Sequence, residues 1–397
     1  MEAVFNRLFR RSERKYNAPI AHTRNVATHK LETQQEAKPP IKVWGAIKNS
    51  LYKLAHWETW HYFIKYVPLY PFWMWYCIRS RSLWFFTPSN PTITFGGFEG
   101  ESKREMYDQL PPGSYPNSIY ISPSISFDEA AAMLVASNIQ YPFAVKPDVG
   151  MMGFLFRKIN TPAEWRAYHT KMPANYILQD LVTYPLEVSV FYYRIPGEAK
   201  GHITGFIKKE FLQVTGNGIS TLLELMEDYP RVRFRLEEMK QKHANKLQQV
   251  IPEGETYCLS QALNLSRGGK LVSLEKEKDE QLLAVFDGLS HYTKHFYYGR
   301  YDIKCSSIED LKTGKNFSIL EFNGSGAEPH HVYGNGNTLL QAYKILLHHW
   351  KMLYRISKQN NRNGVAYWPF KKGWLFLKKA KQHFKQLKQL DTEFPAL

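Results

Sequence analysis

The sequence predicts an α+β protein, and three observations support this fold class. Apolar and polar residues alternate in residues 299–304 and again in 319–324, as in strands with one buried face. Two further strand patterns, at 143–146 and 154–159, are joined by a glycine-containing loop. Ser126, followed by acidic residues, has the composition of a helix start. Strands and helices are therefore expected along the same stretch of chain.

The composition is that of a globular protein, with 397 residues of which 44% are hydrophobic and 22% charged. This length allows one large core or two to three domains. Cys77, Cys258 and Cys305 are odd in number and widely spaced, so they predict neither a disulfide framework nor a zinc site. A reducing, cytoplasmic compartment fits these cysteines. No secretory signal is expected, because no apolar segment follows the basic residues 1–15.

The formal net charge of +16 indicates an anionic partner. Phosphates, a membrane surface and nucleic acid all satisfy this condition, and charge alone does not choose among them. Residues 1–40 begin with a basic amphipathic element and continue as a polar linker ending in two prolines.

Aromatic residues crowd into residues 57–86, with Lys65, Arg79 and Arg81 among them. Aromatic side chains beside basic residues suit a membrane–water interface. An aromatic core packed on the next domain explains them equally well, and stacking on nucleobases is a weaker third interpretation. The longest apolar stretch, 66–78, is shorter than the roughly 20 residues of a spanning helix, and two prolines interrupt it.

Beyond residue 95 the composition becomes that of an ordinary globular domain. Helix starts and strand patterns can be placed from capping residues and from apolar periodicity. The elements expected there are, in chain order, a helix at 102–110, a helix from Ser126, strands at 176–182, 188–193 and 205–210, a helix with Ser220 as its N-cap, a charged helical stretch within 228–250, and helices at 280–295 and 338–354.

Residues 370–390 predict a basic amphipathic helix. Leu377, Phe384 and Leu387 recur at helical spacing among seven lysines. A solvated terminal helix packed by its apolar stripe is one interpretation. Docking on an anionic membrane is the other, since each lysine near such a surface adds about 1 kcal/mol. The aromatic segment at 57–86 favours the membrane.

The two strands within residues 299–324 carry the clearest candidate site. Side chains two apart in a strand share a face, so Arg300 lies beside Asp302, and Glu321 beside Asn323. A turn-rich linker between the strands lets them fold back and brings these side chains together. Two carboxylates and an amide oxygen are ligands that Mg²⁺ takes, and Arg300 would balance phosphate charge. A surface hairpin with solvated charges is the alternative for either strand alone.

Lys146 ends a strand and precedes a loop that contains Gly150 and Gly153. Glycines let the backbone approach a phosphate, loop N–H groups can cradle it, and the lysine adds a point charge. A hairpin with two glycines is common, so this pattern is a weak signal alone. His330 and His331 have no further metal ligand at suitable spacing, and we expect loop histidines near a substrate site.

In combination, these motifs resemble the ATP-grasp superfamily of carboxylate–amine ligases, such as D-alanine–D-alanine ligase, cyanophycin synthetase and glutathione-type ligases. The likeness covers roughly residues 100–340, and it lies in the order and spacing of the motifs rather than in any one of them. The matching motifs are Val145-Lys146-Pro147 with Gly150 and Gly153, Gln179-Asp180 with Glu187, Val214 to Leu225, Leu263 to Gly269, Tyr301-Asp302-Ile303, and Leu320-Glu321-Phe322-Asn323.

The resemblance implies that ATP lies between two α+β subdomains together with two Mg²⁺ ions, for which Mn²⁺ is an alternative. It also implies a role for individual residues. The implied sets are Lys103 and Lys146 at the nucleotide, the Gly150–Gly153 loop over the phosphates, Gln179, Asp180, Leu181 and Val182 along the adenine, Glu187 at the ribose, Asp302, Glu321 and Asn323 at the metal, and Arg300 at the transferred phosphoryl group.

The sequence departs from the family pattern in two places that affect these expectations. Met151 and Met152 stand where the phosphate loop usually has small polar residues. The substrate domain that usually precedes the ATP-grasp core is not recognisable in residues 41–95. The acceptor site is therefore supported least, and its candidate residues are Lys208, Lys209, Asn264, Arg267 and Ser325.

The main hypothesis is an ATP- and Mg²⁺-dependent ligase that activates a carboxylate as an acylphosphate and joins it to an amine. The substrates would be small molecules such as an amino acid, a peptide or a cell-envelope precursor. The rivals are a phosphotransferase on the same scaffold and a non-catalytic nucleotide-binding protein at a membrane surface. The motifs specify no oligomeric state, and nucleic acid is not the expected partner.

The expected organisation has three parts. Residues 1–95 would form a basic, aromatic-rich N-terminal region, 96–345 the ATP-grasp domain, and 346–397 a basic helical tail. The expected location is the cytoplasm, with peripheral attachment to the inner face of the membrane as an open alternative.

Overall fold

The computed structural model describes residues 56–229, 232, 235–260, 269–334 and 336–394. Two compact units are distinguished, Met1–Met74 and Trp75–Leu397. The basic element expected within residues 1–40 lies outside the described residues. Among the described residues, no helix combines the length and the apolar character needed to cross a membrane.

The described part of the first unit is a short helical segment. It contains α3 (Tyr62–Tyr66) and the first residues of α4 (Tyr70–Ser80). His61 caps α3, since its ring Nδ1 accepts a hydrogen bond of 3.3 Å from the Phe63 N–H. The aromatic segment divides between two environments: Trp57 and Trp73 are buried, whereas Phe72 is exposed.

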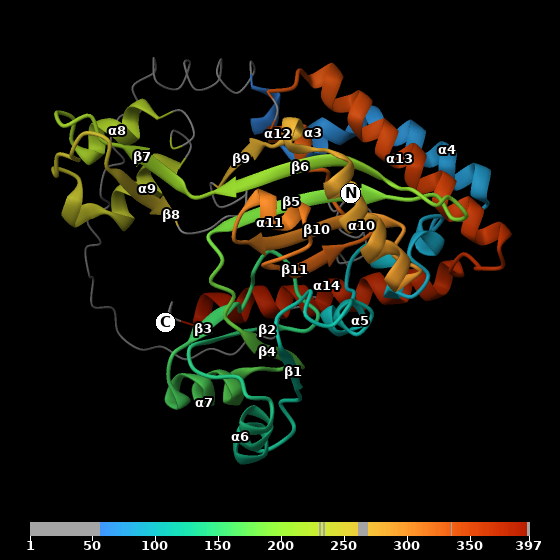
Figure 1. The fold of residues 1–397 in the computed structure, drawn as a ribbon, viewed down its shortest axis with the longest axis horizontal. Coiled ribbons are helices and arrows are strands. Elements are labelled where there is room, and N and C mark those ends of the chain that lie inside the picture. The colour runs from blue at the N-terminus through green and yellow to red at the C-terminus, as the bar shows by residue number, and fades with distance from the viewer. Residues whose placement is uncertain (1–55, 230–231, 233–234, 261–268, 335, 395–397) are drawn as a thin grey trace, which may run out of the picture. The chain divides into compact units, whose positions relative to one another are not determined.

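Two antiparallel sheets form the framework of the second unit (Figure 1). All their strand pairs are antiparallel, and strands distant in sequence lie side by side in both. The four-stranded sheet has the order β1 (Ser118–Ile121), β4 (Tyr176–Asp180), β2 (Phe143–Pro147), β3 (Arg157–Ile159). The five-stranded sheet has the order β11 (Phe317–Asn323), β10 (Tyr298–Cys305), β5 (Leu186–Tyr193), β6 (His202–Glu210), β9 (Lys270–Ser273).

Helices cover both sheets, and a small satellite lies at one end of the five-stranded sheet (Figure 1). The satellite pairs β7 (Leu212–Thr215) with β8 (Thr256–Ser260) and adds α8 (Leu222–Asp228) and α9 (Leu236–Lys242) around its own apolar cluster. The remaining helices are α5 (Lys103–Tyr107), α6 (Phe127–Ala136), α7 (Pro162–Lys171), α10 (Glu280–Thr293), α11 (Ile308–Lys312), α12 (His331–Gly334), α13 (Leu339–Arg362) and α14 (Phe370–Glu393).

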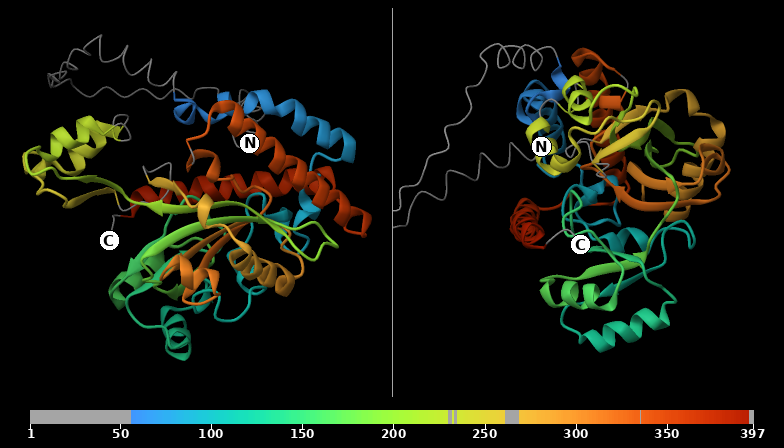
Figure 2. Two further views of the ribbon diagram at one scale, coloured as in Figure 1. Left: turned by 45° about the horizontal axis from the view of Figure 1, so that its top comes forward. Right: turned by 90° about the vertical axis from the view of Figure 1, so that its left-hand side faces the viewer.

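Each sheet has its own apolar core. Tyr301 and Phe286 belong to the cluster that packs α10 on the five-stranded sheet. In the cluster of the four-stranded sheet, Val145 of β2 is joined by Trp165 of α7 and by Leu387 of α14. The C-terminal helix is therefore part of this core, and Figure 2 shows α14 running beside the sheets. Because its apolar stripe is buried in this way, α14 is a structural element of the fold rather than a detached tail.

Most elements expected from the sequence are present, and local capping explains their starts. Ser126 and Glu129 form a reciprocal capping box at α6, and Thr338 and Gln341 form one at α13. Apolar residues at helical spacing keep the buried face of α13 continuous from Ala342 to Ser357.

Three local expectations are wrong: the N-cap of α8, the length of β3 and the structure of the linker between β10 and β11. Thr221, not Ser220, caps α8, because Glu224 three residues later completes a capping box with it, while Ser220 Oγ accepts a bond from Asn217. The strand expected at 154–159 is shorter, since β3 begins at Arg157.

The cause of the shorter strand is the backbone at Leu155, which has φ of 56° and cannot continue an extended strand. The third difference is the expected turn-rich linker between β10 and β11. It contains the helix α11, whose start is capped by Ser307 through a bond from the Asp310 N–H.

Candidate functional site

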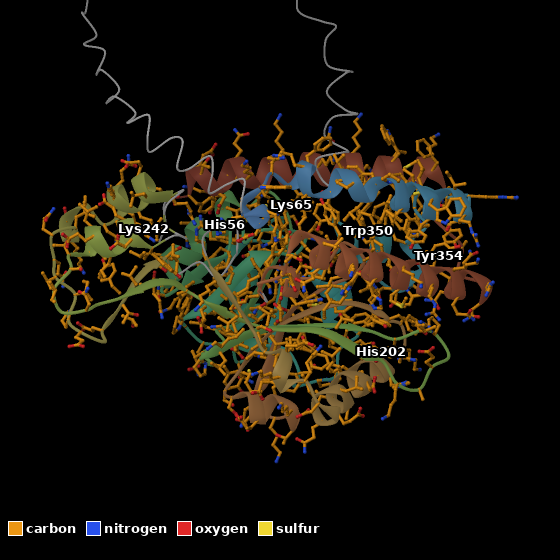
Figure 3. All side chains as sticks on the ribbon, turned by 90° about the horizontal axis from the view of Figure 1, so that it is seen from above. His56, Lys65, His202, Lys242, Trp350 and Tyr354 are labelled. Carbon is orange, nitrogen blue, oxygen red and sulfur yellow. The ribbon has the colours of Figure 1, made fainter. Side chains whose placement is uncertain are left out.

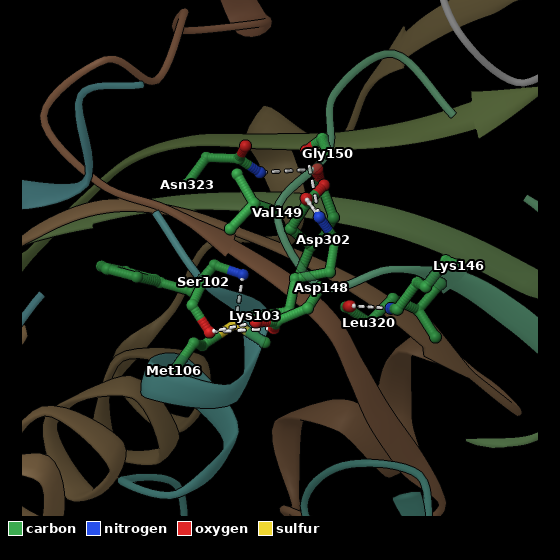
Figure 4. Close-up of polar contacts among 12 residues, drawn as sticks. Ser102, Lys103, Met106, Lys146, Asp148, Val149, Gly150, Asp302, Leu320 and Asn323 are labelled. Atoms are coloured by element: carbon green, nitrogen blue, oxygen red, sulfur yellow. Dashed lines mark hydrogen bonds and ion pairs between the residues drawn. The ribbon is translucent and has the colours of Figure 1, made fainter. Parts of the chain in front are cut away.

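The antiparallel pair β10 and β11 brings the expected metal ligands together, and Figure 4 shows two of them, Asp302 and Asn323. Asp302 lies directly opposite Glu321, and Arg300 lies opposite Asn323. The side-chain amide of Asn323 donates a hydrogen bond of 3.2 Å to Asp302 Oδ2. Residues more than fifteen positions apart in sequence therefore share one side of the sheet, as the period-two pattern predicted.

Asp302 is buried and surrounded by donors. Its carboxylate accepts bonds from Ser189 Oγ at 2.5 Å and from Arg300 Nε and Nη2 at 3.1 and 3.0 Å, and Lys209 Nζ lies 3.1 Å from Oδ1. Burial by itself raises the pKa of Asp302, but the charges of Arg300 and Lys209 outweigh burial and hold this pKa well below its usual range. The carboxylate is therefore ionised at neutral pH.

Lys209 connects Asp302 to a second carboxylate. Its Nζ lies 3.0 Å from Glu187 Oε1, and Lys209 is the cross-strand partner of Glu187 between β6 and β5. Burial lowers the pKa of Lys209, but the two carboxylates raise it above its ordinary value. Lys208, the neighbouring candidate, instead pairs with Glu210 at 2.7 Å. The two neighbouring lysines, both candidates for the acceptor site, therefore pair with different carboxylates.

On the four-stranded sheet, Lys146 is buried near the end of β2. Its Nζ donates to Tyr107 Oη at 2.9 Å and to the Leu320 carbonyl at 3.1 Å, which links the two sheets (Figure 4). Burial, reinforced by the nearby charge of Lys103, lowers the pKa of Lys146 to about 7. At neutral pH part of the Lys146 side chains are therefore uncharged, and an anion bound beside Nζ would favour the protonated form.

Lys103 lies between the glycine loop and the carboxylates. Its Nζ donates to the Gly150 carbonyl at 3.0 Å and lies 3.3 Å from Glu321 Oε1. Ser102 caps α5 and also bonds to Asp148 at 2.8 Å, which ties the start of the loop to the start of this helix. The loop, Lys103 and Glu321 are therefore connected by direct contacts.

The glycine loop itself has the backbone that its sequence suggested. Gly153 has φ of 71°, a conformation that other residues rarely adopt, and Met152 beside it has φ of 55°. Val149 accepts a hydrogen bond of 2.8 Å from His383 of α14 through its carbonyl oxygen. A helix far along the sequence therefore holds this loop.

The segment expected to line an adenine base follows β4. Gln179 is buried, and its Oε1 lies 3.5 Å from Tyr107 Oη. The Val182 carbonyl accepts a bond of 3.0 Å from Lys304. Asp180 is exposed, whereas Leu181 and Val182 are half-buried, so only Gln179 of the four residues lies in the interior.

The acceptor candidates are scattered. Ser325 is buried, and its Oγ has no hydrogen-bond partner among the described residues. Asn264 and Arg267 lie outside the described residues. His330 is beside the charged cluster, where burial and then the positive charge of Arg300 hold its pKa well below the usual value.

His331 takes a different position from its neighbour. It is buried, its ring lies 5.2 Å from that of His349 between centroids, and it covers the backbone of Gly205 so closely that a side chain there would overlap it. Burial lowers the pKa of His331 to about 3. His331 is therefore a core residue rather than a site residue.

Three site residues were missed from the sequence: Ser189, Tyr107 and Glu101. Ser189 is a polar residue between two valines of a strand, and this interruption was a usable signal. Tyr107 carried no signal, since a tyrosine in a short helix is common in cores. Glu101 precedes the expected Lys103, and burial raises its pKa to about 7.

Among the described residues, no group of three histidine, cysteine, aspartate or glutamate side chains is arranged to hold a metal ion. A metal here would depend on two carboxylates and the amide of Asn323. The α+β fold class expected from the sequence is confirmed by the two antiparallel sheets and the helices around them. One sheet carries the buried Lys146, and the other carries the paired carboxylates Asp302 and Glu321.

No protein-family model matches this chain, and no curated protein matches it in sequence. Solved structures do resemble it. A bifunctional glutathione synthetase from Pasteurella multocida is 14% identical over 64% of this chain and 35% of its own, with a TM-score of 0.41. A D-alanine–D-alanine ligase from Bacillus anthracis is 14% identical over 66% of this chain and 67% of its own, with a TM-score of 0.34.

A D-cycloserine synthetase is 13% identical over 62% of this chain and 69% of its own, with a TM-score of 0.36. The chain thus spans about a third of the glutathione synthetase, at 35% of its length, and about two thirds of the other two, at 67% and 69%. These proteins include two of the ligase classes that the sequence motifs resemble. Since all three TM-scores lie below 0.5, the likenesses identify no substrate for the present chain.

Proposed function

We propose that this protein is an ATP-dependent ligase that activates a carboxylate as an acylphosphate and joins it to an amine. One observation carries the proposal. Lys103, half-buried at the start of α5, lies 3.3 Å from the Glu321 carboxylate of the large sheet, and the buried Lys146 of the small sheet donates at 3.1 Å to the Leu320 carbonyl next to Glu321. Cations beside oxygen ligands are what phosphoryl transfer requires.

The phosphate side of the proposed site consists of Lys103, Lys146 and the loop from Gly150 to Gly153. Lys146 donates to neutral oxygens, and its pKa of about 7 would rise beside a phosphate. Lys103 donates to the Gly150 carbonyl, and a phosphate would compete for this donor as the loop moves over it. The loop would also exclude water from a reactive acylphosphate.

The metal side would be formed by Asp302, Glu321 and Asn323, with Mg²⁺ or Mn²⁺ as the ion and two ions as the expected number. The donor chemistry fits, because Asp302 is ionised and all three side chains offer oxygen. Beside Asp302, the buried Nδ1 of His330 has no hydrogen-bond partner among the described residues, which suits an unfilled polar site. A bound ion would supply charge neutralisation between the two reacting anions.

Arg300 and Lys209 would stabilise negative charge at the transferred phosphoryl group. Arg300 holds Asp302 by two bonds, and its Nη1 donates to the Glu328 carbonyl at 2.8 Å, so the guanidinium is fixed in orientation. Glu187 engages Lys209 through Oε1, which leaves Oε2 for a ribose hydroxyl. Gln179 to Val182 would line the base.

The test is formation of a hydroxamate from Mg·ATP, hydroxylamine and pooled carboxylates, because hydroxylamine traps an acylphosphate. Pools of amino acids, dipeptides and cell-envelope precursors are compared by ADP release, then split. Glu321→Ala should abolish both signals while the protein stays folded. Glu309→Ala, which removes an exposed glutamate on α11, is the matched control and should keep them.

Two other results would contradict the proposal. ADP release with a stable phosphate ester and no hydroxamate would identify a phosphotransferase. An active Glu321→Ala protein would refute the metal assignment. A readout apart from turnover is thermal stability: Mg²⁺ with a non-hydrolysable ATP analogue should raise Tm in the native protein and less in Glu321→Ala.

A further inference from the structure

The second unit exposes large apolar side chains on α4, on the segment that follows it and on α14. Trp75 and Ile78 of α4, Leu83 beyond it, and Phe370 and Leu375 of α14 are between 45% and 66% exposed. Trp84 joins the two groups, because its ring stacks on Phe370 at 6.2 Å and its Nε1 donates to the Phe370 carbonyl at 3.1 Å. Scattered apolar residues are ordinary, but a group of exposed apolar side chains linked through one buried tryptophan marks a contact surface.

The same helices are strongly basic, and the acidic residues of α14, Asp391 and Glu393, lie in its last turn. Residues 329–390 contain twelve lysines and arginines and no aspartate or glutamate, and residues 59–98 also have no acidic residue. Lys371, Lys378 and Lys385 recur at seven-residue spacing along the exposed side of α14, in line with Leu375. None of these three lysines forms an ion pair with a carboxylate among the described residues.

The helix α13 completes the basic layer. Its Tyr354 stacks on Tyr76 of α4 at 4.7 Å, and Figure 3 shows Trp350 and Tyr354 on this helix. Arg79 of α4 lies over the exposed Trp75 ring at 5.6 Å, so a cation and an indole are presented together. Aromatic contacts connect α4 directly with α13, and the rings of Phe85, Phe86 and Trp84 connect α13 with Phe370 of α14.

We propose that the exposed residues Trp75, Ile78, Leu83, Phe370 and Leu375, together with the lysines of α14, dock on an anionic lipid bilayer. Such a surface combines apolar side chains that enter the headgroup region with basic ones that meet anionic lipid. A second copy of this chain fits poorly, because two surfaces of the same positive sign would repel each other. Nucleic acid would leave the apolar side chains in water.

Vesicle sedimentation of the full chain tests this surface, with phosphatidylcholine vesicles prepared with and without phosphatidylserine. We expect binding only with phosphatidylserine, and we expect it to weaken as salt rises. Trp75→Ser with Ile78→Ser, and separately Lys371→Glu with Lys378→Glu, should each reduce the partition coefficient about tenfold. These exposed positions are used because removal of α14 would expose core residues such as Leu387.

The matched control is Lys276→Glu with Lys315→Glu, the same change in net charge at exposed lysines outside these helices. It should alter binding less than about twofold. Equal loss in the control and the α14 variant would reduce the effect to net charge and overturn the proposal. Unchanged binding by both surface variants would also overturn it, and would place any attachment elsewhere in the chain. A native dimer that the apolar variant dissociates, without vesicle binding, would identify a second copy as the occupant.

Discussion

The carbonyl oxygen of Val149 accepts a hydrogen bond of 2.8 Å from Nε2 of His383, which joins the glycine loop to α14. The same helix holds the far side of the loop, where Asp391 accepts from the Leu155 N–H at 2.9 Å and pairs with Arg157 at 3.0 Å. The loop is therefore braced at both ends by a helix more than two hundred residues away. This bracing makes loop position dependent on α14.

His383→Ala should raise KM for ATP about fivefold, because one hydrogen bond of about 1 kcal/mol no longer positions the loop. Steady-state kinetics with the substrate pair identified by the hydroxamate assay would measure this. His383→Gln, whose amide can still donate to Val149, is the control and should remain near the native value. Equal effects in both variants would mean that the imidazole acts by packing and not through this bond.

Lys146 should make nucleotide binding take up a proton. Burial lowers its pKa to about 7, and the phosphates of a bound nucleotide would raise it again. Above pH 7 the free protein has lost this proton and must regain it, so affinity for ATP should fall as pH rises, by up to about tenfold per pH unit.

Calorimetric titration at pH 8 in buffers of different ionisation enthalpy measures the proton uptake. Lys146→Arg stays charged at every pH used and should take up none at this position. Binding whose heat is independent of the buffer would contradict the assignment of Lys146 to the phosphates.

Ionisation of the buried Glu101 carboxyl group should lower the free energy of unfolding as pH rises. Burial raises its pKa to about 7, so between its ordinary value of 4.5 and 7 the folded state binds more protons than the unfolded state. Stability contributed by this group is full below pH 4.5 and falls as pH rises to 7. Glu101→Gln removes the titration and should be more stable than the native protein by about 1–3 kcal/mol at pH 8, with no difference at pH 4.

Urea unfolding at the two pH values checks this prediction. Glu309→Gln, at an exposed position, is the control and should show no such difference. A Glu101→Gln protein that is less stable than native at pH 8 would mean that the carboxylate forms a favourable ion pair, and the argument from burial would fail.

The strands and the paired carboxylates could be predicted from sequence, because alternation along a strand is local information. Asp302, Glu321 and Asn323 were placed on one side of a hairpin for that reason, and the register agrees. The partners of Asp302 could not be predicted in this way. Ser189 lies 113 residues before Asp302 and meets it only because β5 pairs with β10.

The same limit applies to α14. Its amphipathic pattern predicted a buried stripe, but which surface the stripe covers depends on the tertiary fold. The two ends of the glycine loop, at Val149 and Leu155, each bond to this helix. Sequence spacing carries no sign of these contacts, and the positive φ at Leu155 that shortens β3 belongs to the same arrangement.

Asp302→Asn should cost about 3–5 kcal/mol of stability at pH 7, because it leaves the buried cations of Arg300 and Lys209 without their shared carboxylate. The native carboxylate has a pKa well below its usual range, since the two cations outweigh burial. Its contribution is therefore present above the ordinary aspartate pKa of about 3.9 and is lost as pH falls toward the lower folded value. Urea unfolding should show the difference in stability between native and variant protein shrinking below about pH 4.

Asp108→Asn removes an exposed carboxylate paired with Arg104 and should cost less than about 1 kcal/mol both at pH 7 and below about pH 4. A comparable cost in both variants would mean that Asp302 is held no more strongly than a surface carboxylate, and the preformed charged centre inferred here would not exist.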